Sequence, residues 1–192
     1  MTDRIAHALR AGTLALCGAL VASAGAAEYG QVVPEKSEIA FESQQMGVAV
    51  PGRFPKFTAE MSFDPARPEA GQGRIEIDLG SIDAGSPDAN TEVKRKPWLD
   101  VAGFPKATFV ASRFRALGGG RYEAAGKLTI KGRSQDVVAP FTFAAEGAQG
   151  RFQGTLKIKR LAFMVGEGTW SDTDTVADDV SVRFRLVANA RK

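Results

Sequence analysis

The sequence predicts an all-β fold in which about eight antiparallel strands close into a barrel, with one short helix. From Ser37 onward, apolar residues recur at every second position, which is the period of a strand with one buried face. Glycine-rich links, such as Gly118-Gly119-Gly120 and the link from Gly147 to Gly150, indicate hairpins between antiparallel neighbours. An open sheet of this size would expose its edges, so we expect closure.

The strands are assigned from the alternation of apolar and polar residues. The pattern is clearest where Phe152, Gly154, Leu156 and Ile158 alternate with polar residues. We expect strands at 29–33, 37–46, 52–63, 73–80, 106–114, 121–131, 136–146, 150–160 and 178–189.

One segment predicts a helix. Ser86-Pro87-Asp88 offers a capping residue, then proline at the first helical position and an acid in the first turn. We expect the helix to extend over 89–96, and Pro97 to end or kink it. Trp98 and Leu99 then belong to a following turn that packs over the sheet.

The first 27 residues have the three regions of a secretory signal peptide. Arg4 and Arg10 precede an apolar stretch over 11–21, and small residues follow over 22–27. The apolar stretch is shorter than the ~20 residues that span a bilayer. We expect cleavage after Ala27, although cleavage after Ala26 also satisfies the small-residue rule. The remaining domain, 28–192, would then be periplasmic.

The composition of residues 28–192 excludes several kinds of chemistry. The single histidine and the single cysteine, His7 and Cys17, both lie in the leader. The exported part therefore lacks the commonest metal ligand, proton shuttle and thiol nucleophile, and we expect no metal, no cofactor and no catalytic residue. Its 23 basic and 21 acidic residues are interspersed, which does not favour nucleic acid as a partner.

An enzyme would have to rely on paired carboxylates. The densest acidic group comprises Asp172, Asp174, Asp178 and Asp179. It does not match a calcium loop, because Ala177 replaces the required glycine. Two interpretations of this group remain: a glycosidase-type acid pair, or a polar loop that leads into the last strand.

Whether the barrel is hollow is left open by the sequence. Ala124, Gly126, Ala139 and Gly154 occupy the apolar register, where a filled core would need bulk. These residues predict internal space, or else the taper and bulges of a solid barrel.

Five ordered stretches carry a resemblance to a known family: Lys36 to Phe41, Gly52 to Phe57, Met61 to Pro65, Phe104 to Phe109 and Gly126 to Gly132. With Gly168-Thr169-Trp170 near the end, they make the chain similar to the YceI-like family of exported lipid-binding proteins, from Tyr29 to Ala190. The resemblance implies a lipocalin-like, elongated barrel with a helix against it. It also implies an apolar tunnel for an isoprenoid amphiphile, such as a polyprenyl phosphate or an isoprenoid quinone, which the protein carries or stores.

The chain departs from the family at positions where many members have histidine. Lys36, Gln45 and the region from Thr91 to Lys94 stand there instead. Head-group recognition through those histidines therefore does not transfer to this chain.

If the tunnel exists, its lining consists of the inward-facing apolar residues and the large aromatics of the loops. The candidates are Phe41, Phe57, Phe63, Ile77, Trp98, Phe109, Gly126, Leu128, Ala139, Phe141, Phe143, Leu156, Phe163, Trp170, Phe184 and Leu186. Trp98, Phe104, Phe163 and Trp170 would be a plug or an entrance. Candidates for binding a head group are Arg53, Lys56 and Lys94, although the run from Lys94 to Lys96 also fits a solvated helix end.

Two functional readings remain. The first is a carrier of a long-chain isoprenoid, with a membrane cytochrome or another membrane protein as a partner. The second is a solid-core exported barrel that acts as a protein-interaction or stress-related module. The sequence leaves the oligomeric state open.

Overall fold

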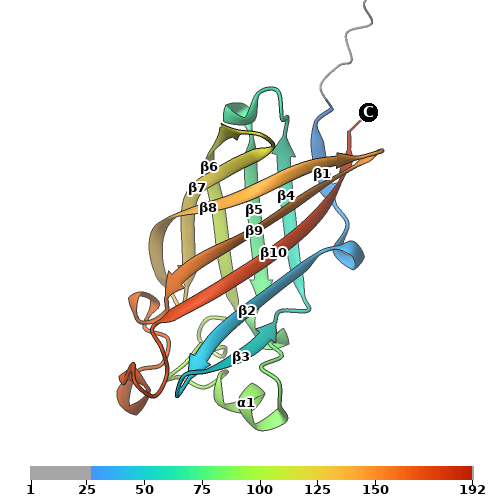
Figure 1. Cartoon of the computed structure of the whole chain (residues 1–192). Coiled ribbons are helices and arrows are strands. Elements are labelled where there is room, and N and C mark those ends of the chain that lie inside the picture. The colour runs from blue at the N-terminus through green and yellow to red at the C-terminus, as the bar shows by residue number, and fades with distance from the viewer. Residues whose placement is uncertain (1–26, 192) are drawn as a thin grey trace, which may run out of the picture.

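Ten antiparallel strands form one sheet, and eight of them close into an elongated barrel (Figure 1). The computed structural model describes residues 27–191, so the predicted leader, apart from Ala27, lies outside the described residues. The strands are β1 (Tyr29–Val32), β2 (Glu38–Gln45), β3 (Val48–Arg53), β4 (Phe57–Phe63), β5 (Gln72–Asp78), β6 (Lys106–Gly118), β7 (Arg121–Ile130), β8 (Arg133–Glu146), β9 (Gln149–Lys159) and β10 (Asp179–Ala190). The helical segments are η1 (Pro34–Lys36), η2 (Pro68–Ala70), η3 (Leu79–Ser81), α1 (Pro87–Glu92), η4 (Arg160–Phe163) and η5 (Gly168–Ser171).

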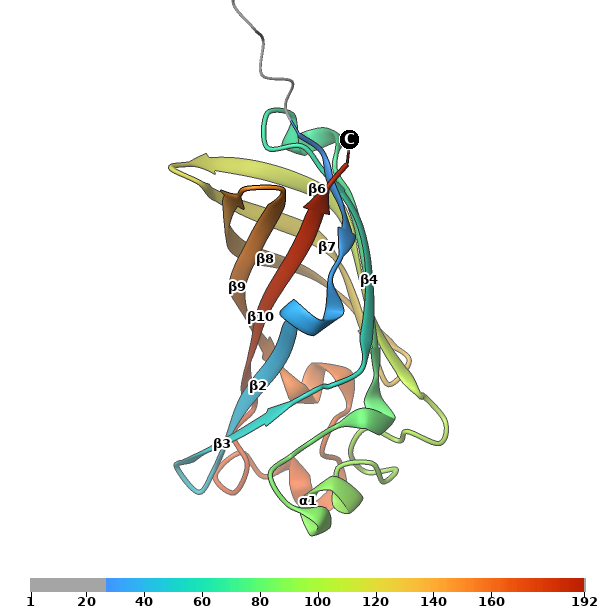
Figure 2. The same cartoon turned by 90° about the vertical axis from the view of Figure 1, so that its right-hand side faces the viewer.

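The barrel closes because β10 has two partners along one edge. Its end pairs with β1, where Tyr29 lies opposite Ala190, while its beginning pairs with β2, where Glu42 lies opposite Ser181. The ring then runs from β1 through β4, β5, β6, β7, β8 and β9 back to β10. The hairpin of β2 and β3 extends the wall beyond this ring, toward the end that carries α1 (Figure 2). The predicted all-β barrel with one short helix is confirmed.

The expected single strand over 52–63 was wrong. The segment contains two strands, β3 and β4, which pair with different neighbours and are separated by Phe54-Pro55-Lys56. Pro55 has no backbone N–H for a sheet ladder, and the Phe54 N–H donates to the carbonyl of Ile39. The chain therefore leaves the β2–β3 hairpin at this point and enters β4, which pairs with β1 and β5.

The helix begins where the sequence predicts and ends earlier. The Ser86 hydroxyl oxygen accepts a hydrogen bond from the Ala89 N–H at 3.2 Å, and Pro87 occupies the first helical position. The helix ends at Glu92 instead of Lys96, and turns follow in which the Leu99 N–H donates to the Val93 carbonyl. None of the helices in the described chain combines the length and the apolarity needed to cross a membrane.

Two clusters of buried residues form the core. The first fills the barrel end near the termini and centres on Phe63, whose ring lies 5.2 Å from those of Tyr122 and Phe152. The second lies at the α1 end and includes Leu79, Ile82, Leu99 and Ala107.

Candidate functional site

The barrel encloses an apolar cavity of about 550 Å³. This volume falls within the range of about 300–1,000 Å³ typical of ligand sites. Inward-facing side chains of β2 and of β5 to β10 supply most of the wall, and the aromatic cluster around Phe63 blocks one end. Along β10 the wall extends from Val180 to Leu186, which corresponds to about 20 Å of strand. The cavity is therefore long and blind at one end.

Most of the predicted lining residues lie on this wall. They are Phe41, Ile77, Trp98, Phe109, Leu128, Ala139, Phe141, Leu156, Phe163, Trp170, Phe184 and Leu186.

Phe57, Phe63, Gly126 and Phe143 do not lie on the wall. Phe63 is fully buried within the aromatic cluster, and the ring of Phe143 lies 4.9 Å from that of Tyr29. Phe57 packs against the same cluster. These aromatics fill one part of the barrel, so its interior is solid at one end and hollow toward the other.

The four small residues that predicted internal space, Ala124, Gly126, Ala139 and Gly154, also fall into two groups. Ala124 and Ala139 face each other across β7 and β8 on the cavity wall. Gly126 instead permits a close approach of backbones, since a Cβ there would overlap the Val110 carbonyl oxygen and lie 2.8 Å from the Cα of Ala111. The same holds for Gly154, which lies against the Pro140 carbonyl. Of these four residues, the two alanines lie on the cavity wall and the two glycines do not.

Arg160 is a buried charge on the cavity wall that the sequence analysis did not select. It is 3% exposed, and its guanidinium lies 5.7 Å from the centre of the Trp98 ring. Burial lowers the pKa of Arg160, and the charge of Asp178 opposes this effect. Its N–H groups donate at 2.7–3.1 Å to the carbonyls of Val165, Gly166, Trp170, Val176 and Ala177.

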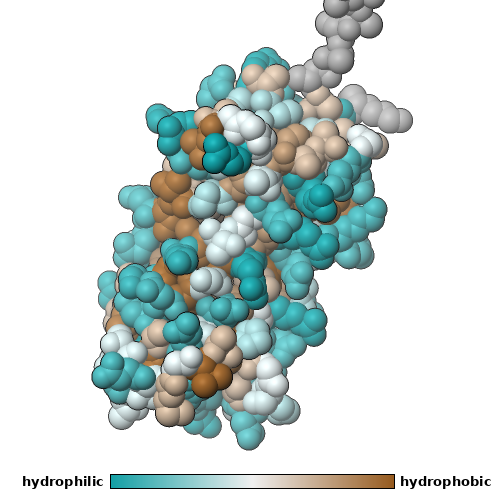
Figure 3. All heavy atoms as spheres, in the orientation of Figure 1, coloured by the Kyte–Doolittle hydropathy of each residue, from teal (hydrophilic) through white to brown (hydrophobic). Residues whose placement is uncertain are grey.

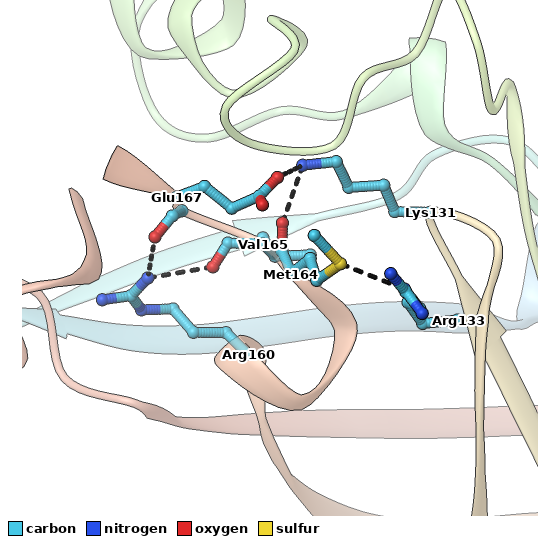
Figure 4. A network of polar contacts seen from close by, with 7 residues as sticks. Lys131, Arg133, Arg160, Met164, Val165 and Glu167 are labelled. Carbon is cyan, nitrogen blue, oxygen red and sulfur yellow. Dashed lines mark hydrogen bonds and ion pairs between the residues drawn. The ribbon is translucent and has the colours of Figure 1, made fainter. Parts of the chain in front are cut away.

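A second buried cation holds the same segment from the other side (Figure 4). Lys131, in the turn between β7 and β8, donates to the Met164 carbonyl at 2.7 Å and to the Glu167 carboxylate at 2.6 Å. Arg133 contacts the sulfur of Met164 at 3.0 Å. Together with Arg160, these residues fix the segment over 160–178 across the end of the barrel.

Trp98 and Trp170 lie on the wall with ring centres 5.3 Å apart. The Nε1–H of Trp98 is buried and has no hydrogen-bond partner within the described chain. Phe104, also predicted as a plug or entrance, is 38% exposed and lies off the cavity, beside Gly132. The tryptophan pair therefore forms part of the cavity wall.

Polar residues on the wall mark the mouth. The inward face of β2 changes from Ile39 and Phe41 to Ser43 and Gln45, and α1 adds Asp88 and Glu92. The mouth thus lies between the β2–β3 hairpin and α1. The ionisable wall residues of these elements are Asp88 and Glu92, and Arg95, which follows α1, pairs with Glu92 at 3.0 Å.

None of the predicted head-group residues lies on the cavity wall. Arg53 points to solvent with 63% of its side chain exposed and pairs with Asp83 at 3.1 Å. Lys56 is exposed and Lys94 is half-buried.

The acidic loop residues have local bonding roles. Asp172 accepts hydrogen bonds from the Thr175 hydroxyl at 2.7 Å and the Asp174 N–H at 3.0 Å, which lower its pKa. Asp178 accepts from the Leu161 N–H, and Asp179 pairs with Lys159. Within residues 27–191, no three acidic, histidine or cysteine side chains are grouped as metal ligands.

Comparison with known proteins agrees with this architecture. The family model of the YceI-like domain matches residues 31–188. The chain belongs to the YceI-like family. It is similar to BcnA of Burkholderia cenocepacia, with 45% identity, a TM-score of 0.81 and coverage of 83% of this chain and 100% of that chain. A UPF0312 protein of Pseudomonas syringae is 28% identical over 171 residues, which cover 83% of this chain and 89% of the relative.

A more distant solved structure shares the fold. It is a polyisoprenoid binding domain from Saccharophagus degradans, with 16% identity and a TM-score of 0.64, and the match covers 86% of this chain and 99% of that one. The YceI-like barrel thus retains its shape while most of its sequence varies.

Proposed function

We propose that the protein binds the apolar chain of an isoprenoid lipid inside the barrel, for carriage or storage, without changing it covalently. The observation that carries this proposal is the long, blind cavity with an almost wholly apolar wall. The name of the Saccharophagus degradans domain supports the same class of ligand. The proposal assigns this role to the periplasm, because residues 1–27 have the three regions of an export leader.

Apolar burial is sufficient to drive binding. At about 0.8 kcal/mol for each buried CH₂ group, twenty carbons of a ligand chain contribute on the order of 15 kcal/mol before losses. Ordering of the chain and of the protein removes much of this gain. Since the wall distinguishes poorly between apolar chains, selectivity has to come from the length of the cavity and from its mouth.

The mouth favours an uncharged head group, such as a quinone or an alcohol, over a phosphate. Asp88 would repel an anion there, while the Glu92 carboxylate is paired with Arg95 at 3.0 Å. Arg160 has donated its hydrogen bonds to backbone carbonyls, and Arg74, the other cation on the wall, pairs with Glu76. Within the described chain, both cations on the wall already have hydrogen-bond acceptors, and neither belongs to the hairpin or to α1.

The test is a titration followed by the fluorescence of Trp98 and Trp170, which lie on the wall. A ubiquinone and a polyprenyl phosphate of equal chain length are compared directly, with displacement of a fluorescent fatty amine as a second readout. We expect the quinone to bind at least about tenfold more tightly, which corresponds to 1.4 kcal/mol. Equal or tighter binding of the phosphate would contradict the choice of head group, and binding of neither would contradict the proposed function.

The double variant Asp88→Asn, Glu92→Gln isolates the contribution of the mouth. Both substitutions keep the side-chain shape and remove the charge. We expect polyprenyl phosphate to gain affinity while ubiquinone affinity stays within about twofold. The matched control is Asp136→Asn, which removes an exposed carboxylate on the outer face of β8.

A further inference from the structure

The tip of the β2–β3 hairpin exposes two apolar side chains. Met46 is 72% exposed and Val48 is 66% exposed, the highest values among the large hydrophobic residues of the described chain. Met46 and Gly47 form the turn, with φ angles of 49° and 78°. In Figure 3, tan and brown spheres lie among hydrophilic ones at the end of the molecule where this hairpin ends in Figure 1.

The tip is held in place. The Met46 N–H donates to the Thr175 carbonyl, and the Ala177 N–H donates to the Gln44 carbonyl, both at 2.9 Å. Gln45 also forms an isolated β-bridge with Val176. The segment that supports the tip is the one that Arg160 and Lys131 fix to the barrel. The exposed side chains are therefore presented on a rigid support.

The tip is continuous with the cavity mouth. Gln45 and Val50, which flank it on β2 and β3, both lie on the cavity wall. A ligand that enters between the hairpin and α1 therefore passes within a few residues of Met46 and Val48. The exposed apolar surface and the entrance to the apolar interior form one feature.

We propose that Met46 and Val48 insert into the surface of a lipid bilayer, so that the cavity mouth opens against the membrane that supplies the isoprenoid. This inference rests on the proposed function. Two side chains are far less than the ~800 Å² that each partner buries in a stable protein interface, and they suit brief, reversible adsorption to lipid. Asp88 and Glu92 line the mouth, and Arg95 offsets the charge of Glu92, so the matching lipid surface is zwitterionic and not anionic.

The experiment measures ubiquinone uptake from phosphatidylcholine vesicles by quenching of tryptophan fluorescence. If docking delivers the ligand, the uptake rate of the unmodified protein rises with vesicle concentration. The double variant Met46→Ser, Val48→Ser should take up ubiquinone at least about fivefold more slowly. Its equilibrium affinity for a short-chain ubiquinone added from solution should remain unchanged. Vesicles containing phosphatidylglycerol should give slower uptake than pure phosphatidylcholine.

The matched control is Val138→Ser, which removes a 51% exposed valine from the outer face of β8. Its uptake rate should equal that of the unmodified protein. The docking proposal would be overturned if the uptake rate did not depend on vesicle concentration. It would also be overturned if the Met46→Ser, Val48→Ser variant took up ubiquinone as fast as the unmodified protein. Binding of the short-chain quinone without any uptake from pure lipid vesicles would also overturn it, and would point to a protein partner. Failure of the unmodified protein to bind the short-chain quinone would instead reject the proposed function.

Discussion

Replacing Ala139 with leucine should fill part of the cavity without disturbing the barrel. Ala139 lies on β8, is 5% exposed and belongs to the cavity wall opposite Ala124. Leucine adds three carbons at this position. Because the wall borders about 550 Å³ of space, these carbons enter volume that a ligand chain would otherwise occupy.

The expected loss of affinity follows from the displaced ligand. Three CH₂ groups at about 0.8 kcal/mol each amount to about 2.4 kcal/mol, or roughly a 50-fold weaker affinity for a long-chain quinone. The free energy of unfolding should change by less than about 1 kcal/mol, because the new side chain meets space. In a solid core, the same substitution would overpack the interior and cost about 1–3 kcal/mol of stability.

The assay combines the quinone titration with urea unfolding of the ligand-free protein. The control is Ala144→Leu, which adds the same carbons to the exposed face of the same strand. Full retention of quinone affinity by a folded Ala139→Leu variant would refute the reasoning. A loss of stability typical of an overpacked core would refute it as well.

Three further predictions concern stability. Arg160→Lys should lower the free energy of unfolding by about 3 kcal/mol or more in urea titrations. A lysine cannot reach all the carbonyls that Arg160 binds, and each buried unpaired group costs about 1–3 kcal/mol. A loss below about 1 kcal/mol would contradict this role. Gly126→Ala should destabilise the barrel in the same assay, because the Cβ of the new alanine would overlap the Val110 carbonyl oxygen. An unchanged urea midpoint would contradict this, since it would show that β6 and β7 can move apart at little cost. Hydrogen bonds, chiefly that from Thr175, hold the pKa of Asp172 in the folded protein below its usual value of 3.8. The contribution of Asp172 to stability is therefore fully present above pH 3.8 and is lost as the pH falls through the lower pKa of the folded state. The urea midpoint should therefore decline below about pH 4, and less steeply in Asp172→Asn; identical profiles would contradict this assignment.

Much of the barrel was predictable because alternation with a period of two is a local property of the chain. The error at 52–63 arose because β3 and β4 both alternate, and only their different partners show that the chain changes neighbours between them: β3 pairs with β2, whereas β4 pairs with β1 and β5. The helix was overextended for a related reason. Lys94, Arg95 and Lys96 are good helix formers, but Leu99 is drawn into the core beside Leu79 and Ile82.

The site was predictable on its apolar side and much less so at its mouth. Inward-facing positions follow from the strand period, which is why residues such as Phe109 and Leu156 were found. The mouth depends on how the hairpin meets α1, and that contact is non-local. Arg160 did leave a signal, because it continues the inward register of Leu156 and Ile158, where a charge requires buried partners.

The central claim is that the cavity holds a long isoprenoid chain. The most direct measurement is native mass spectrometry, followed by solvent extraction, on protein purified without detergent from the exported compartment. The account predicts a discrete co-purifying species with an isoprenoid chain and an uncharged head group, and its loss in Ala139→Leu. An empty protein that also fails to take up quinones, polyprenols and polyprenyl phosphates would contradict the account.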